Sequence, residues 1–144
     1  MYRPACLLLI TSLSIPALAT DAIKASRQET FGDVTVHYNT FNSTALQPDI
    51  AKGAGLIRSK DKGVINVSVI RNGTSQVAQV SGTVKDLANA SLPLGFKPVT
   101  DYGAVSYMAQ YPVPQQEVRI FDISVQTGGT THRFSFNQEL FPGP

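Results

Sequence analysis

The pattern of a β-hairpin is present in Val64-Ile-Asn-Val-Ser-Val-Ile-Arg71, followed by Asn72-Gly73 and by Thr74 through Lys85. Two β-prone runs flank Asn-Gly, the dipeptide most typical of a two-residue turn, because both central positions of a type I′ turn need φ > 0. Such a tight turn also sets the register of the two strands. The predicted register opposes Arg71 with Thr74, Val69 with Gln76, Val67 with Ala78, and Ile65 with Val80.

This hairpin would be apolar on one face and polar on the other, since side chains alternate along a strand. A sheet with one apolar face has to bury that face against another layer, so we expect a second sheet to pack on the first. The predicted apolar face carries Ile65, Val67, Val69, Ala78 and Val80, and the polar face carries Asn66, Ser68 and Gln79.

Alternation of apolar and polar residues recurs in other segments and predicts further half-buried strands. In one of them, 117–126, the apolar positions change parity after Ile120, which predicts a β-bulge. The clearest alternating sets are Val34, Val36 and Tyr38 in one strand and His132, Phe134, Phe136 and Leu140 in the closing strand.

Prolines restrict the remaining segments. Pro93 and Pro98 cannot donate to a ladder, so the segment around them is an edge strand or irregular. Pro48 and Gly53 are placed to begin and end a crossover helix of at most about two turns. The sequence therefore predicts an all-β fold, an antiparallel immunoglobulin-like β-sandwich of seven or eight strands with one short crossover helix. A small closed barrel is the alternative.

The first 19 residues have the features of a secretory signal peptide: Arg3, an apolar run, and Ala17-Leu-Ala19 before the cleavage point. The run is too short to span a bilayer, which takes about 20 apolar residues. Cys6 precedes the run instead of following it, which argues against a lipoprotein. We expect residues 1–19 to be a signal peptide and residues 20–144 to be one exported domain without stable membrane insertion. Because that domain has no cysteine, the predicted location is the bacterial periplasm.

Charge and motif content exclude several functional classes. The formal net charge is only +2 and falls by one with Arg3, so nucleic acid is a poor candidate partner. The only histidines, His37 and His132, lack neighbours at metal-ligand spacing. Ser59 to Lys62 match S-x-x-K of penicillin-recognising enzymes, without the partner motifs of that class. We therefore predict no catalytic residues, no metal site and no cofactor.

Several segments are similar to those of a known family. They are His37-Tyr-Asn-Thr-Phe-Asn-Ser-Thr44, Ile57-Arg-Ser-Lys60, Asn66-Val-Ser68, Val80-Ser-Gly-Thr-Val84, Phe121-Asp-Ile123 and Phe141-Pro142. With these segments the chain resembles domain-of-unknown-function family 4426, uncharacterised exported proteins of proteobacteria. The resemblance implies a periplasmic, all-β, immunoglobulin-like domain with no assigned activity. It supplies no functional residues.

The polar residues of the first two segments also have a physical interpretation. Asn39 and Asn42 lie where a strand becomes a crossover, and Arg58 lies where the crossover returns. Side chains of these types bond backbone groups that a ladder has released, so a structural role is one hypothesis and partner recognition is the other. Together with His37 and Tyr102, they are the candidate binding residues.

The predicted function is a non-enzymatic binding module for a periplasmic protein, a peptide or an envelope component. One alternative is an assembly component or chaperone that acts by strand addition. The other is a hydrolase whose site assembles around His37, with a hydroxyl and an acid from neighbouring strands.

Overall fold

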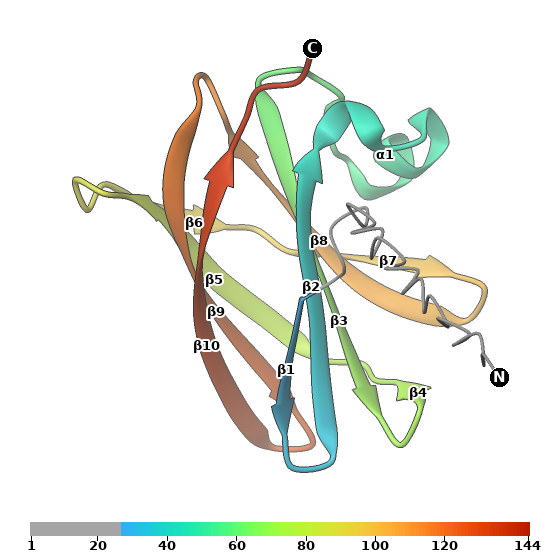
Figure 1. Cartoon of the computed structure of the whole chain (residues 1–144). Coiled ribbons are helices and arrows are strands. Elements are labelled where there is room, and N and C mark those ends of the chain that lie inside the picture. Colours follow the sequence, from blue (N-terminus) through green and yellow to red (C-terminus); the bar gives the residue numbers. More distant parts are fainter. Residues whose placement is uncertain (1–26) are drawn as a thin grey trace, which may run out of the picture.

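A computed structural model describes residues 27–144, which form two antiparallel sheets packed face to face (Figure 1). The first sheet has the order β1-β2-β3-β8-β7, with β4 paired to β3, and the second has the order β10-β9-β5-β6. The strands are β1 (Arg27–Phe31), β2 (Val34–Asn42), β3 (Lys62–Arg71), β4 (Thr74–Ser75), β5 (Gln79–Asp86), β6 (Ser91–Leu94), β7 (Lys97–Asp101), β8 (Ala104–Pro112), β9 (Glu117–Thr127) and β10 (Thr130–Leu140). The helices are a 3-10 turn, η1 (Ser43–Ala45), and α1 (Pro48–Ala54).

The predicted all-β sandwich is confirmed, and the alternative of one closed sheet is wrong, because no ladder joins the two sheets within residues 27–144. The described residues form ten strands instead of seven or eight. The extra strands arise where the chain changes sheets: the predicted strand 74–85 divides into β4 and β5, and the segment around Pro93 and Pro98 divides into β6 and β7. Pro93 and Pro98 lie in β6 and β7, which are both edge strands, as predicted.

The Asn72-Gly73 turn is confirmed, with φ of 50° and 72°, but the hairpin is much shorter than predicted. Pairing continues only as far as Gln76, whose N–H donates to the Val69 carbonyl at 2.8 Å. The predicted pairs of Val67 with Ala78 and of Ile65 with Val80 are wrong. Two residues beyond Gln76, the Ala78 N–H donates to the Tyr107 hydroxyl at 2.8 Å, and the chain crosses to the second sheet.

The core lies between the sheets, where the predicted inward faces of β2, β3 and β10 are buried. Aromatic rings fill its centre: Phe121 stacks on Phe136 with centroids 4.9 Å apart, and Tyr38 contacts Phe134 and Phe136 at 4.7 and 4.5 Å. Offset ring contacts of this kind stabilise a core beyond the area they bury. At its rim, His132 stacks on Phe31 at 4.7 Å, in agreement with the sequence pattern of β10.

The predicted bulge in β9 is wrong, since β9 pairs residue by residue with β10 along its whole length. Ile120 and Val118 therefore face outward, and Arg119 faces inward and is 7% exposed. The guanidinium of Arg119 is satisfied there by the Glu117 carboxylate and by the Pro112 carbonyl, the latter at 2.7 Å. An inward arginine between two outward apolar residues explains why hydrophobic periodicity indicated a change of parity.

The crossover between β2 and β3 covers part of the outer face of the first sheet (Figure 1). Helix α1 begins at Pro48, as predicted, but ends at Gly55, which has φ 67°, and not at Gly53. A left-handed residue just beyond the last turn is the usual stop of a helix. Helix α1 places Ala51 and Ala54 in a second small apolar cluster, together with Leu46, Leu56 and Val64.

The predicted signal peptide and its cleavage point lie outside the described residues. Within 27–144, no helix has both the length and the apolar character that crossing a membrane requires.

Candidate functional site

The five predicted binding residues do not form one site. His37 and Asn39 lie in the middle of β2, opposite the polar residues of β3. Tyr102 is fully exposed at the tip of the β7–β8 hairpin. Asn42 and Arg58 lie together at the end of the sandwich where the crossover leaves β2 and returns to β3. Of the five residues, only Asn42 and Arg58 belong to one hydrogen-bonded cluster, and this cluster lies next to a pocket.

The two segments that resemble the family most closely are hydrogen-bonded to each other at this end. The buried Ser43 hydroxyl donates to the Ser59 carbonyl at 2.7 Å and accepts from the Ser59 N–H at 2.8 Å. The Asn42 Nδ2 donates to the Lys60 carbonyl at 2.9 Å. These bonds hold the start and the return of the crossover side by side.

Asn42 and Arg58 both act on the turn between these segments. Asn42 is the N-cap of η1, and its Oδ1 accepts from the Thr44 N–H at 3.0 Å and from the Thr44 hydroxyl at 2.7 Å. The Arg58 Nη2 donates to the Thr44 carbonyl at 3.2 Å. These contacts join the two side chains to nearby backbone groups and to the Thr44 hydroxyl, which is the structural role that the sequence suggested.

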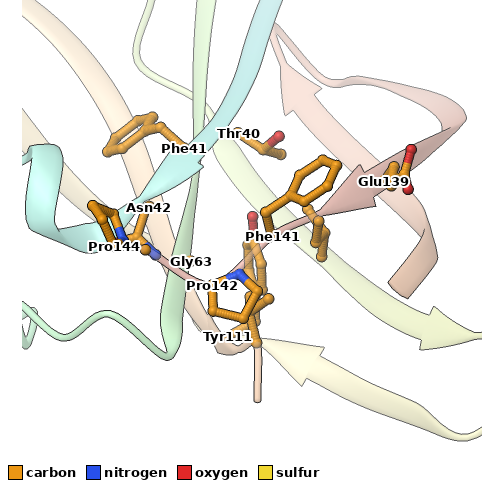
Figure 2. Close-up of a pocket in the computed structure, with 12 residues that line it drawn as sticks. Thr40, Phe41, Asn42, Gly63, Tyr111, Glu139, Phe141, Pro142 and Pro144 are labelled. Carbon is orange, nitrogen blue, oxygen red and sulfur yellow. The ribbon is translucent and has the colours of Figure 1, made fainter. Parts of the chain in front are cut away.

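A pocket of about 260 Å³ lies next to this cluster, at the end of the sandwich (Figure 2). Its walls come from the ends of β2, β3, β8 and β10 and from the segment that follows β10. The lining residues are Thr40, Phe41, Asn42, Gly63, Tyr111, Val113, Glu139, Leu140, Phe141, Pro142, Gly143 and Pro144.

The segment after β10 closes one side of this pocket. The Gly143 N–H donates to the Lys60 carbonyl at 2.6 Å, so the segment reaches from the second sheet to the first. A side chain at position 143 would come within 2.7 Å of the Asn42 Oδ1, which explains the glycine there. Phe141 borders the pocket with 52% of its surface exposed.

Tyr111 forms the base of the pocket. Its ring lies against the backbone of Gly63, where any side chain would overlap the ring, and its hydroxyl lies 3.5 Å from the Val64 carbonyl. Burial raises the pKa of the Tyr111 hydroxyl far above its ordinary value, and a hydrogen bond with Thr40 and the charge of Arg119 lower it by less. The phenol therefore stays neutral at physiological pH and can serve as a hydrogen-bonding group but not as a base.

Glu139 is the other titratable residue of the pocket. It is exposed, and its Oε1 accepts from the Gln116 side chain at 2.7 Å. Neither group is hydrogen-bonded to a serine, cysteine or histidine within residues 27–144, as the base of an activated nucleophile of that kind would be. What the pocket offers is apolar walls with a few hydrogen-bonding groups.

The other chemical candidates from the sequence are separated in space. Asp33 lies in the turn before β2, where it pairs with Arg71 at 3.4 Å. Within residues 27–144, no three residues of the types His, Cys, Asp and Glu gather at one point. In the S-x-x-K segment, the Ser59 hydroxyl bonds to Asp61 and the Ser59 carbonyl accepts from the Lys62 N–H at 3.2 Å, which is turn geometry.

Sequence reasoning did not identify the pocket itself. Tyr111, Gly63 and Phe141 come from three different strand ends, and only the fold brings them together. One signal was present, because Phe41-Asn42 and Phe141-Pro142 both belong to segments by which the chain resembles the family. A glycine at the start of a β-branched strand, Gly63, was a second signal for close approach by another residue.

The chain was compared with known proteins. A model of the family described as "Domain of unknown function (DUF4426)" matches residues 28–143. No curated protein sequence matches. A crystal structure of a DUF4426 family protein from Pseudomonas aeruginosa PAO1 is 44% identical, with a TM-score of 0.79 over 83% of this chain and 97% of that one.

Two more distant structures are of FetP from uropathogenic Escherichia coli strain F11. One is the protein as isolated after expression in the periplasm of E. coli, with 9% identity and a TM-score of 0.60 over 82% of this chain and 95% of that one. The other is a copper-bound variant, with 10% identity and a TM-score of 0.59 over 82% of this chain and 91% of that one. At this identity the similarity extends to the fold alone.

Proposed function

The chain belongs to the DUF4426 family, and from this premise we propose that it is a non-enzymatic binding module of the periplasm. In this proposal, the pocket at the end of the sandwich takes up an apolar side chain of a protein or peptide partner. The features of a signal peptide at residues 1–19 support the location, and the neighbour FetP was itself expressed in the periplasm.

The observation that carries the proposal is the pocket between Tyr111 and Phe141. Its volume of about 260 Å³ lies below the roughly 300–1,000 Å³ typical of small-molecule and cofactor sites. A pocket of this size suits one large side chain or two small ones. Apolar walls around a few polar groups are also the usual surroundings of an anchor residue at a protein interface.

Phe141 extends this pocket onto the surface. A half-exposed phenylalanine next to a pocket gives a partner an apolar platform, and aromatic residues are enriched at the centres of interfaces. Lys60 and Arg58 lie close by in the sequence segment that borders Asn42 and are exposed. An apolar anchor is therefore the partner chemistry that fits best, with acidic neighbours beside Arg58 and Lys60 and not beside Glu139, which lines the pocket.

Copper binding has less support. Copper is bound in a variant of FetP, which resembles this chain in fold alone. The two histidines of this chain lie in different sheets, His37 in β2 and His132 in β10. His132 is stacked on Phe31 and is thereby part of the apolar rim.

Selection of random peptides displayed on phage would test the proposal, with residues 20–144 as the target. Selected peptides should share an apolar anchor, and Phe141→Asp should abolish their binding. Leu87→Asp, the same change in charge at another exposed apolar residue, on the β5–β6 loop, is the matched control and should leave binding intact. Peptides that bind both variants equally, or the recovery of no peptide at all, would refute the proposal.

A further inference from the structure

A groove runs between helix α1 and the outer edge of β7, and it shares no lining residue with the pocket of Figure 2. Its volume is about 280 Å³. One wall is formed by α1 and the other by the edge strand of the first sheet. The lining residues are Asp49, Ile50, Gly53, Ala54, Pro98, Val99 and Thr100.

Within residues 27–144, no strand pairs with β7 on the side that faces away from β8. Asp101 and Ala104 flank a two-residue turn and form a hydrogen-bonded pair, so Val99 and Lys97 also bond to β8. The N–H and carbonyl of Thr100 and the carbonyl of Pro98 therefore point away from the sheet. Pro98 occupies a position where β7 needs no donor, which is why it is tolerated there.

The side chains around this edge are placed to contact the side chains of an added strand. Val99 projects toward α1 and packs against its apolar cluster, with Ile50 partly buried beside it. A strand added along β7 would direct alternate side chains toward α1, into the groove. Gly53 leaves this wall open, since a Cβ at that position would meet no atom within 4 Å.

Charge around the groove is acidic. Asp49 lines it and Asp101 ends β7, and neither carboxylate has an ion-pair partner within residues 27–144. Two cations lie on the same elements but do not line the groove: Lys97 is directed to the Gly55 carbonyl at 3.4 Å, and Lys52 is in the last turn of α1. An apolar segment with basic residues is complementary to these two carboxylates.

Tyr102 stands at the end of the same edge. It is fully exposed at the tip of the β7–β8 hairpin, with φ of 48°. A bulky residue in the left-handed region is strained, and such strain is typical of binding and recognition sites. An aromatic ring at the end of a binding edge gives a partner an additional contact surface.

The other sheet edges are less suited to strand addition. β6 is shorter than β7, with four residues against five. The edge of β10 faces β1, whose Arg27 donates to the Asn137 carbonyl at 3.1 Å. Edges of these kinds are protected against pairing.

From these observations we propose that the β7 edge binds an extended peptide segment of a partner protein by strand addition. The segment carries an apolar side chain in the α1–β7 groove and basic residues beside Asp49 and Asp101. Backbone pairing supplies affinity and the groove supplies specificity, as in other strand-addition sites. This surface is separate from the pocket at Tyr111, so either proposal can fail without the other.

The test is a titration of ¹⁵N-labelled protein with the peptide acetyl-Thr-Lys-Val-Thr-Val-Lys-Thr-amide, followed by NMR. Amides of β7 and α1 should shift, and the exchange of the Thr100 N–H with solvent should slow on binding. A peptide with glutamates in place of both lysines should bind more weakly. Shifts centred on Tyr111 and Phe141, or none at up to about 1 mM peptide, would overturn the proposal.

Two variants examine the mechanism of binding. Thr100→Pro removes the outward N–H without removing a hydrogen bond to β8, and should lower the affinity for the peptide about tenfold. Its control is Thr131→Pro, at an exposed outward position of β10. Gly53→Leu fills the groove and should also weaken binding, whereas Lys52→Leu, on the same helix but outside the groove, should not. Equal binding by Thr100→Pro and wild type would exclude strand addition.

Discussion

Ser43 serves as a strand partner for Ser59: its hydroxyl both donates to the Ser59 carbonyl and accepts from the Ser59 N–H, at 2.7 and 2.8 Å. One side chain thus satisfies both backbone groups of a residue that has left the sheet. Ser43 itself is completely buried. The crossover between β2 and β3 is therefore anchored by a buried hydroxyl and not by apolar contacts alone.

Ser43→Ala should lower the free energy of unfolding by about 1–3 kcal/mol, because the Ser59 N–H loses its partner and the Ser59 carbonyl keeps only the Lys62 N–H. Urea denaturation followed by circular dichroism measures the loss. Ser81→Ala, on the exposed face of β5, is the control and should change stability by less than about 0.5 kcal/mol. Equal effects of the two substitutions would mean that Ser59 finds another partner.

Local signals predicted the elements of the fold well. The Asn72-Gly73 turn, the inward faces of β2 and β10, and the helix start at Pro48 all follow from residue types and spacing. The point where the chain changes sheets did not follow, because residues 74–85 alternate as one strand. That point depends on the Tyr107 hydroxyl, which comes from β8 and is distant in sequence.

The candidate site was predicted only in part, for a similar reason. Asn42 and Arg58 were identified because polar residues at a strand end have a local role in satisfying the backbone. No local pattern distinguishes Tyr111 from the other inward residues of β8. Its place in a pocket is set by Gly63 of β3 and by the segment at Phe141, and neither contact leaves a periodic pattern in the sequence.

Gly63→Ala should destabilise the protein by about 1–3 kcal/mol, because the added methyl would overlap the Tyr111 ring, which cannot move away from a filled core. In a Tyr111→Leu background the same change should cost much less, since a leucine leaves room at that point. A double-mutant cycle from urea melts measures this coupling. Additive effects would show that the ring does not set the requirement for glycine.

Alkaline pH should reduce stability through Tyr111. Its pKa is raised in the folded protein, whereas in the unfolded chain the phenol ionises near about 10. The stabilisation is fully present below that pH and is lost as pH rises toward the folded pKa, because only the unfolded state releases the proton. Tyr111→Phe should therefore flatten the decline in stability above about pH 10. If stability declines with the same slope in Tyr111→Phe, other groups cause the decline. Tyr38 is one of them, because burial raises its pKa as well.

The last prediction concerns two hairpin tips of the first sheet, those of β3–β4 and β7–β8. Asn72 and Tyr102 occupy the same position of their two-residue turns, with φ of 50° and 48°. Asparagine tolerates this conformation and tyrosine does not, while the exposed Tyr102 ring has no packing to offset the strain.

Tyr102→Asn should therefore raise the free energy of unfolding by about 0.5–1 kcal/mol, and the reciprocal Asn72→Tyr should lower it by a similar amount. Thermal and urea melts of both variants measure this. A gain in stability from Tyr102→Asn would mean that the tyrosine is kept at a cost to folding, which is expected of a residue that contacts a partner. A loss of stability would show instead that the Tyr102 ring supports the hairpin, and would remove it from the proposed β7 binding edge.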